Sequence, residues 1–339
     1  MENMNKQHVM LLFGGESSEH EVSIASARNV FGAIDKATYE LSLVFIGKGG
    51  RWWLIDSFDD HAHPTVQLSL RPGTSTFTTS DARSITPDIL FPVLHGRNGE
   101  DGSVQGLAQL LHLPIVGCDM TASVLAMDKI AAKEVFAHHG LDVLPFVVHH
   151  QGEPTPDYAE IASTLGPILF IKPSRAGSSV GISRVTNEAA FANALDEAHV
   201  HDEFILIEQA ANHPRELEVA VLGTPPHHEA SVVGEIRPDG EFYSYDSKYS
   251  DSSTSSVVIP ADISNELAQT IREQALAAYS ALKCRGFARV DFLLDDTGLY
   301  INEINTIPGF TDISMYPKLW EASGLSYSAL IDRLIALAR

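Results

Sequence analysis

The stretch GFARVDFLLDDTGLYINEINTIPGFT, residues 286–311, contains two predicted strands and the tight turn that joins them. Gly298 ends the turn segment 296–298, and a glycine there supplies the positive φ that short hairpin turns require. The strands are then expected to pair so that the following residues lie opposite each other: Asp295 and Leu299, Asp291 and Glu303, Arg289 and Asn305.

Side chains alternate between the two faces of a strand, so this pairing gathers four polar residues on one face: Arg289, Asp291, Glu303 and Asn305. The other face carries Ala288, Val290, Phe292, Tyr300 and Ile304. Two carboxylates directly opposite each other repel unless a cation lies between them. Carboxylate and amide oxygens suit Mg²⁺, so the sequence predicts a metal site at Asp291, Glu303 and Asn305, with phosphates completing the octahedron.

The alternative for this hairpin is an exposed turn whose acidic side chains are simply solvated. Asp291 and Glu303 alone would favour that alternative, because acids are common on ordinary hairpins. Arg289 beside them, Asn305 two residues after the glutamate, and a rigid Pro-Gly turn at 308–309 favour a functional site instead.

Length and composition are those of an ordinary globular protein. The 339 residues are 44% hydrophobic and 20% charged, and a chain of this length predicts two or three domains. The formal net charge of -21 argues against nucleic acid or an anionic membrane surface as a partner, because phosphate-binding surfaces are usually basic. It does not argue against ATP, for which a few cationic side chains in a cleft are sufficient.

Cysteine usage and the start of the chain predict a cytoplasmic protein. Cys118 and Cys284 form no CxxC pair and are expected to be buried, reduced thiols. The start MENMNKQHVMLLFGG has too short an apolar run for a signal peptide. No run approaches the ~20 apolar residues of a membrane span.

The first part of the chain predicts an α/β domain. A strand at 8–13, a Gly-Gly turn and a helix at 22–34 form one unit, and further strands follow at 41–46 and 88–94. Residues 47–86 are expected to form a small β excursion with loops. Neither GxGxxG nor GxxxxGKS/T is present, so the Rossmann-fingerprint and Walker A modes of nucleotide binding lose support.

Three polar segments are candidates for binding. HGRNGEDG, residues 95–102, follows a predicted strand at the sheet edge where ligands bind in α/β proteins. KPSRAGSSVGI, residues 172–182, joins two strands, and its N–H and hydroxyl groups can cradle phosphate with Lys172 as the counter-charge. The long segment EFYSYDSKYSDSSTSS, residues 241–256, is expected to be a lid or binding loop. The alternative for each is a plain solvated turn or serine tract.

The middle and end of the chain predict further helices. One continuous helix is predicted at 121–139, begun by Thr121 and stopped by Gly140. An amphipathic helix at 267–282 precedes the hairpin, and a closing helix at 326–338 carries an apolar stripe.

Four separated motifs then agree in order and spacing with one family. GGESSEHEVS, HGRNGEDG with MDK downstream, KPSRAGSSVGIS, and RVD followed by NEINTIPGFT resemble the D-alanine–D-alanine ligases of the ATP-grasp superfamily. The resemblance runs from about residue 9 to residue 338, nearly the whole chain.

The resemblance implies a mixed α/β (α+β) protein with the ATP-grasp fold in three domains. Residues 1–122 would be a Rossmann-like N-terminal domain with the first D-alanine site, and residues 123–213 a central subdomain with the phosphate loop 172–182. Residues 214–339 would be the C-terminal subdomain, with the lid at 241–256 and the metal hairpin at 286–305. The nucleotide site would lie between the central and C-terminal domains.

The resemblance also implies which residues bind ATP and metal. Those that match the family's phosphate, adenine and ribose groups are Lys129, Lys172, Ser178, Ser179, Glu208, Gln209, Ala210, Ala211, Glu216 and Lys248. Asp291, Glu303 and Asn305 match the ligands of two Mg²⁺ ions, for which Mn²⁺ is a substitute. The metal assignment agrees with the reasoning from the hairpin itself.

The substrate groups follow in the same way. Those that resemble the residues at the two D-alanines and at the oxyanion are Glu19, His95, Arg289, the Gly309 N–H, Ser314 and Met315. Tyr249 in the lid matches the tyrosine that bonds toward Glu19 and Ser178. The resemblance further implies a homodimer.

The implied reaction joins two D-alanines through an acyl phosphate, at the expense of ATP, for peptidoglycan precursor synthesis. A D-alanine–D-lactate or D-alanine–D-serine ligase is the nearest alternative, and Tyr249 argues against lactate. A catalytically dead ATP-grasp protein is a second alternative, against which the intact Arg289, Asp291, Glu303 and Asn305 argue. A purely structural α/β protein would need all four motifs to be coincidental turns.

Overall fold

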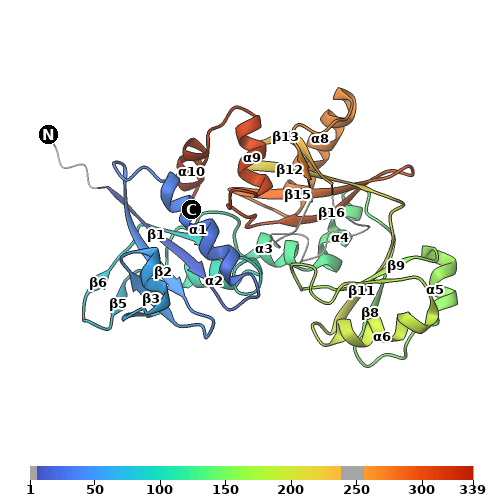
Figure 1. Cartoon of the computed structure of the whole chain (residues 1–339), viewed down its shortest axis with the longest axis horizontal. Coiled ribbons are helices and arrows are strands. Elements are labelled where there is room, and N and C mark those ends of the chain that lie inside the picture. Colours follow the sequence, from blue (N-terminus) through green and yellow to red (C-terminus); the bar gives the residue numbers. More distant parts are fainter. Residues whose placement is uncertain (1–5, 238–255, 339) are drawn as a thin grey trace.

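The structure, a computed structural model, describes residues 6–237 and 256–338. Within these ranges the strands form three sheets, each built from one continuous part of the chain (Figure 1). The segment predicted to be a lid, 241–256, lies outside the described residues except for Ser256, which begins β14. Lys248 and Tyr249 therefore also lie outside the described residues.

The first sheet has the order β6-β5-β4-β3-β2-β1-β7, and β1 pairs in parallel with β2 and β7. Its strands are β1 (Gln7–Gly14), β2 (Tyr39–Ile46), β3 (Trp52–Ile55), β4 (Val66–Leu70), β5 (Phe77–Thr79), β6 (Ser84–Ile85) and β7 (Ile89–Val93). The parallel strands with α1 (His20–Ala33) and α2 (Ser103–Leu110) form the predicted α/β unit. The antiparallel strands β3 to β6, with a short 3-10 helix at Phe58–Ala62, confirm the β excursion predicted for 47–86.

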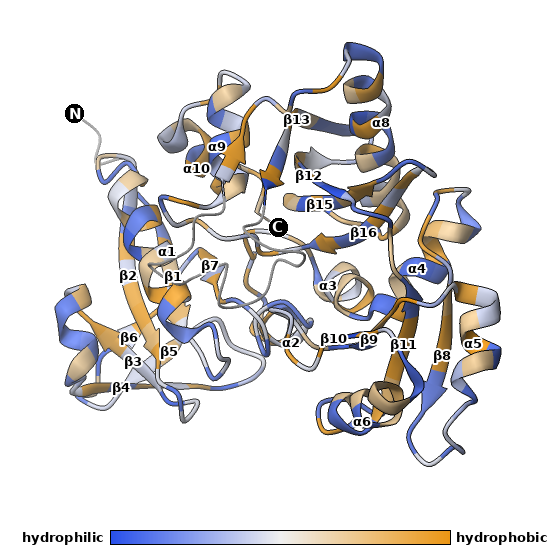
Figure 2. Cartoon of the chain, turned by 45° about the vertical axis from the view of Figure 1, so that its right-hand side comes forward, coloured by the Kyte–Doolittle hydropathy of each residue, from blue (hydrophilic) through white to orange (hydrophobic). Residues whose placement is uncertain are grey.

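The second sheet is antiparallel, with the order β10-β9-β11-β8. Its strands are β8 (Phe146–His150), β9 (Leu169–Pro173), β10 (Ser183–Val185) and β11 (Phe204–Gln209). Helices α5 (Tyr158–Leu165) and α6 (Glu188–His199) bury Ile161 and Phe191 against the strands. Figure 2 shows β8 and β11 coloured largely hydrophobic, as expected of strands that this helical layer covers.

The third sheet has the order β14-β13-β12-β15-β16. Its strands are β12 (Arg215–Thr224), β13 (His227–Arg237), β14 (Ser256–Val258), β15 (Phe287–Leu294) and β16 (Leu299–Asn305). Because side chains alternate along β12, Val219 packs under α8 (Asn265–Ala281) while Leu222 packs under α9 (Met315–Ala322) on the other face. That second face is apolar at one end and becomes polar toward Glu218 and Asp291, where the site lies.

The hairpin confirms the predicted register at the polar residues and corrects it near the turn. Asp291 lies opposite Glu303, and Arg289 lies opposite Asn305, as predicted. A bulge follows Asp291, so Leu294 rather than Asp295 pairs with Leu299. The extra residue is in β16. As a result Ile301, rather than Tyr300 as predicted, lies on the apolar face, where it pairs with Phe292 and packs into the core.

The helix predicted at 121–139 is two helices, α3 (Met120–Met127) and α4 (Lys129–His138). Asp128 breaks it, with φ -82° and ψ 100°, and its carboxylate accepts the Ala131 N–H of the second helix. An aspartate favours this capping position because its oxygen satisfies an N–H group that the helix leaves unpaired. The break makes Lys129 the first residue of α4. Before α3, Ile115 forms a single parallel bridge with Leu90 of β7.

The last helix of the chain packs on α1 as well as on α9, so it joins the first part of the chain to the last. α10 (Tyr327–Ala336) contributes Leu330 and Leu334 to the same core as Leu11 and Phe13 of β1. Figure 1 shows α10 beside α1, at the junction between the blue and red ends of the chain. In the described ranges, no helix has the length and apolar character needed to span a membrane.

Candidate active site

A cavity of about 400 Å³ lies where all three parts of the chain meet. Most predicted site residues line it, namely Glu19, His95, Lys129, Lys172, Ser178, Ser179, Glu208, Ala210, Ala211, Glu216, Arg289, Asp291, Glu303, Asn305, Gly309, Ser314 and Met315. Gln209 does not line it, and its N–H donates to the carbonyl of Pro145. The cavity therefore brings together residues nearly 300 positions apart in sequence.

The strands β12 and β15 hold a partly buried arginine among carboxylates. Arg289 donates from Nε and Nη2 to the two oxygens of Asp291, at 2.7 and 2.6 Å, and its Nε lies 3.0 Å from Glu218 Oε2. Burial lowers the pKa of Arg289, but the charges of Asp291 and Glu218 outweigh it and raise the pKa well above its usual value. A permanently charged fork of N–H donors is thus fixed at the cavity wall.

The donor set on the hairpin fits a hard divalent cation. Asp291 and Glu303 lie directly opposite each other and both line the cavity. Asn305 Oδ1 accepts the Ile307 N–H at 3.0 Å, which holds the amide in place and leaves a second lone pair on that oxygen. The described residues contain no group of three His, Cys, Asp or Glu arranged for a metal. Two carboxylates and one amide instead suit Mg²⁺ that takes its other ligands from phosphates.

Two lysines share one buried glutamate at the cavity wall. Lys133 Nζ and Lys172 Nζ each lie 2.5 Å from an oxygen of Glu208, which is buried. Burial raises the pKa of Glu208, but the two ammonium charges outweigh it and lower the pKa from 4.5 to about 2. The Glu208 side chain is therefore an ionised anchor for Lys172.

Lys129 bridges the phosphate loop and the metal hairpin. Its Nζ donates to the carbonyl of Ala176 at 2.7 Å and lies 3.9 Å from Glu303 Oε2. Burial lowers the pKa of Lys129, and Glu303 partly offsets this. In the same loop Ser178 and Ser179 have φ of 53° and 58°, a left-handed conformation that costs energy in residues other than glycine. Strain at two successive residues is typical of a loop shaped for a ligand.

The first domain contributes Glu19, the N-terminal cap residue of α1, and His95, which follows β7. His95 is buried, and its Nδ1 lies 3.0 Å from the carbonyl of Ile307 while Nε2 lies 3.1 Å from Ser26 Oγ. Burial lowers the pKa of His95, and Glu19 partly offsets this. The neutral ring thus ties the end of β7 to the turn that carries Gly309.

The turn after β16 is built closely around Gly309 and Ser314. Thr311 donates to Ser314 Oγ from its N–H at 3.0 Å, and the two hydroxyls lie 2.8 Å apart. A Cβ at Gly309 would lie only 2.6 Å from Ser314 Oγ, so the turn requires glycine for this close approach. The Gly309 backbone and the Ser314 hydroxyl therefore face the cavity from one compact unit.

Sequence reasoning missed three charged residues of this site: Glu100, Lys133 and Glu218. Glu100 lines the cavity and accepts the Gly96 N–H at 2.9 Å; burial raises its pKa well above the usual range, and Glu19 adds to this. Glu100 belongs to the HGRNGEDG motif, and Glu218 alternates with Glu216 on one strand. Lys133 follows Lys129 by four positions, which places both on one helix face. These spacings are the signals that could have found them.

Comparisons with known proteins give one consistent result. The family model for the D-ala D-ala ligase N-terminus matches residues 8–118, and that for the C-terminus matches residues 135–336. D-alanine–D-alanine ligase of Sodalis glossinidius is 48% identical, over 98% of this chain and 95% of the relative. D-alanine–D-alanine ligase A of Escherichia coli K12 is 44% identical, over 99% and 96%.

Solved structures of related ligases share the fold. The D-alanine–D-alanine ligase from Coxiella burnetii has a TM-score of 0.86 at 36% identity, covering 98% of this chain and 95% of that one. The VanG D-Ala:D-Ser ligase from Enterococcus faecalis has a TM-score of 0.88 at 34% identity, covering 98% and 99%. The fold alone therefore does not distinguish acceptor amino acids, whereas the curated relatives at 44–48% identity favour D-alanine.

Proposed function

The chain belongs to the D-alanine–D-alanine ligase family, and we propose that its ATP-dependent ligation of two D-alanines takes place in the cavity where the three sheets meet. The product, D-alanyl-D-alanine, serves peptidoglycan synthesis. The observation that carries the proposal is the convergence of cations and carboxylates on one cavity: Lys129 and Lys172 from one side, Asp291 and Glu303 from another, and Glu19 from the first domain.

In the first step the carboxylate of one D-alanine attacks the γ-phosphorus of ATP, ADP leaves, and an acyl phosphate forms. Both reactants are anionic, so the step needs positive charge at the phosphates. We assign this to Lys129 and Lys172, with the strained loop at Ser178 and Ser179 over the phosphates. Two Mg²⁺ ions on Asp291, Glu303 and Asn305 would supply further charge when bound, and Mn²⁺ would fit the same oxygens.

In the second step the amine of the other D-alanine attacks the acyl carbonyl, and inorganic phosphate leaves. The tetrahedral intermediate carries an oxyanion that needs fixed N–H donors. Arg289 and the Gly309 N–H are assigned to it, because both residues line the cavity and the guanidinium of Arg289 is held by Asp291. Glu19 and His95 are assigned to the first D-alanine, and Ser314 and Met315 to the carboxylate of the second.

The remaining assignments complete the proposal. Glu208 to Ala211 would receive the adenine, Glu216 the ribose, and Lys248 and Tyr249 would act from the segment outside the described residues. The domain limits are 1–122, 123–213 and 214–339, which keep each sheet whole. We further propose a cytoplasmic homodimer that uses small-molecule substrates and no nucleic acid, consistent with the net charge of -21.

Two arginines of the third sheet provide the test. Arg289 lines the cavity, whereas Arg215 forms an equally close ion pair with Glu235 on the same sheet but outside it. Arg289→Met is expected to lower kcat by about 10²–10³-fold, as for loss of an oxyanion donor, and Arg215→Met by no more than a few-fold. Equal effects of the two variants on kcat would show that the oxyanion is stabilised elsewhere.

A further inference from the structure

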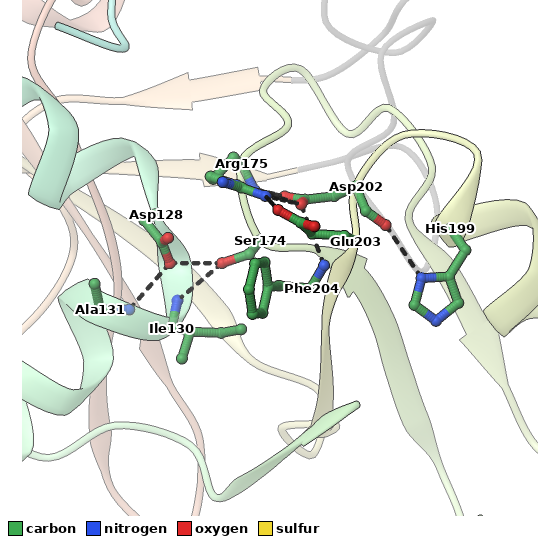
Figure 3. A network of polar contacts seen from close by, with 9 residues as sticks. All are labelled: Asp128, Ile130, Ala131, Ser174, Arg175, His199, Asp202, Glu203 and Phe204. Carbon is green, nitrogen blue, oxygen red and sulfur yellow. Dashed lines mark hydrogen bonds and ion pairs between the residues drawn. The ribbon is translucent and has the colours of Figure 1, made fainter. Parts of the chain in front are cut away.

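The first turn of α4 is hydrogen-bonded to the start of the phosphate loop through Ser174 (Figure 3). Ser174 has no exposed surface, and its hydroxyl donates to Asp128 Oδ1 at 2.7 Å and accepts the Ile130 N–H at 3.3 Å. Its carbonyl accepts the Lys129 N–H at 3.0 Å. We call Ser174 and Asp128, with these hydrogen bonds, the loop clamp.

The loop clamp uses up the free N–H groups at the start of α4. The N–H groups of Lys129 and Ile130 bond to Ser174, and that of Ala131 bonds to Asp128. The helix start therefore offers no free backbone donors to a phosphate at these three positions. What α4 presents to the cavity is the Lys129 ammonium, which donates to the carbonyl of Ala176 in the loop.

The other side of the loop is fixed to β11. The Arg175 N–H donates to Asp202 Oδ2 at 2.7 Å, and its guanidinium pairs with the same carboxylate and with Glu203. The Ser174 N–H donates to the carbonyl of Phe204 at 2.9 Å. Figure 3 shows the contacts of Arg175 with Asp202 and Glu203 on one side of Ser174 and the Asp128 contacts on the other. Ser174 is thus the residue where α4, the phosphate loop and the second sheet are joined.

We propose that Ser174 is a positioning residue for the phosphates of ATP, because the loop clamp keeps Lys129 and Lys172 aimed at one place. Lys172 lies on β9, two residues before Ser174, and Lys129 directly follows Asp128 at the start of α4. A small rotation of α4 against the loop would separate the two ammonium groups. The inference rests on the proposed roles of Lys129 and Lys172 as phosphate ligands.

The test replaces Ser174 by alanine and uses Ser123→Ala as the matched control. Ser123 lies in α3, is equally buried, and its hydroxyl has no hydrogen-bond partner among the described residues. Steady-state kinetics would measure KM for ATP, KM for D-alanine and kcat. Calorimetry would measure Kd for a non-hydrolysable ATP analogue. Ser174→Ala is expected to raise the ATP KM and the analogue Kd roughly tenfold, with KM for D-alanine as in Ser123→Ala.

Two outcomes for Ser174→Ala would overturn the proposal. One is a KM for ATP equal to that of Ser123→Ala. The other is an equal loss in kcat, in both KM values and in the analogue Kd, together with a lower melting temperature. If Ser174→Ala does not fold, Ser174→Cys keeps the shape with a weaker hydrogen-bonding group and is judged by the same criteria. Lys129→Ala run beside them separates the two proposals. Weak analogue binding in Lys129→Ala but not in Ser174→Ala rejects the clamp alone; normal binding in Lys129→Ala rejects the phosphate site itself.

Discussion

Glu208 shows how a single buried carboxylate can hold two lysine side chains. Its side chain is 1% exposed and lies between Lys133 and Lys172, so it satisfies two charges that would otherwise be buried alone. Removing either partner of such a group is costly because the remaining charge stays desolvated. The same contacts lower the pKa of the carboxylate, so it stays ionised in acid in which a solvated glutamate would be protonated.

The pH dependence of this contact can be measured. The pKa of Glu208 is lowered to about 2 from 4.5. Its contribution to stability is therefore complete above pH 4.5 and is lost as the pH falls from there toward 2. The free energy of unfolding of wild type minus that of Glu208→Gln is expected to shrink by up to about 3 kcal/mol over this range. Urea unfolding at several pH values measures it, with exposed Glu134→Gln on α4 as the control, whose difference should stay flat.

The metal assignment also belongs to the scale of single residues. Glu303→Gln keeps the size of the side chain but removes one of the two negative charges of the facing pair Asp291 and Glu303. We expect ligation to fall sharply and the Mg²⁺ concentration for half-maximal activity to rise at least about tenfold. Glu229→Gln, on the same sheet and paired with Arg333 outside the cavity, should leave the Mg²⁺ requirement unchanged. An unchanged Mg²⁺ requirement in Glu303→Gln would remove this residue from the metal site.

What could be predicted at this scale depended on local spacing. The facing pairs of the hairpin were predicted from pairing the two strands across the turn, and the structure confirms two of the three, Asp291 with Glu303 and Arg289 with Asn305. The four-residue spacing from Lys129 places Lys133 on the same helix face but does not reveal its burial, because a lysine on a helix is usually exposed. Its burial is decided by β11, which brings Glu208 to it from 75 positions away in the sequence.

At the scale of elements, the turn at Gly309 is closely packed against Ser314. In Gly309→Ala the new Cβ would contact Ser314 Oγ at 2.6 Å, so the hydroxyl or the turn must move. We expect kcat to fall tenfold or more, roughly, with little change in binding of the ATP analogue. Gly49→Ala is the control, because a Cβ there meets nothing within 4 Å. Equal kcat in the two variants would mean that this turn takes no part in the reaction.

The two element-level corrections have the same physical origin. The break at Asp128 and the bulge in β16 each cost regular hydrogen bonds, which local sequence patterns favour keeping. Each is compensated by contacts distant in sequence: Asp128 by Ser174, and the bulge by packing of Ile301 into the core. Helical periodicity through 121–139 contains no information on Ser174, so the sequence alone predicted one helix.

For the whole molecule, the ends of the chain share one core. Leu330 of α10 is fully buried with β1 and α1, although more than 300 residues separate it from Leu11. Asn29 also donates to the carbonyl of Phe310 at 3.1 Å and to Asp312 at 2.9 Å, which ties α1 to the turn beside the site. The first sheet and the site turn are therefore expected to be stabilised together.

Leu330→Ala tests this coupling. The void that the lost side chain leaves should lower the free energy of unfolding by about 2–5 kcal/mol. It should also speed hydrogen exchange in β1 and α1 as well as in α10. Ile161→Ala, which opens the separate core of the second sheet, should leave exchange in β1 unchanged. If only α10 exchanged faster in Leu330→Ala, the two ends of the chain would be independent units.

The most direct measurement of the central claim is ATP-dependent phosphate release by the purified chain with Mg²⁺ and D-alanine, with products separated by mass. L-alanine alone, and D-alanine with D-lactate or D-serine, would be run beside it. The account predicts phosphate release with D-alanine and none with L-alanine, with D-alanyl-D-alanine as the main product even when D-lactate or D-serine is present. Binding of ATP without turnover, or an ester or a D-alanyl-D-serine product in preference, would contradict it.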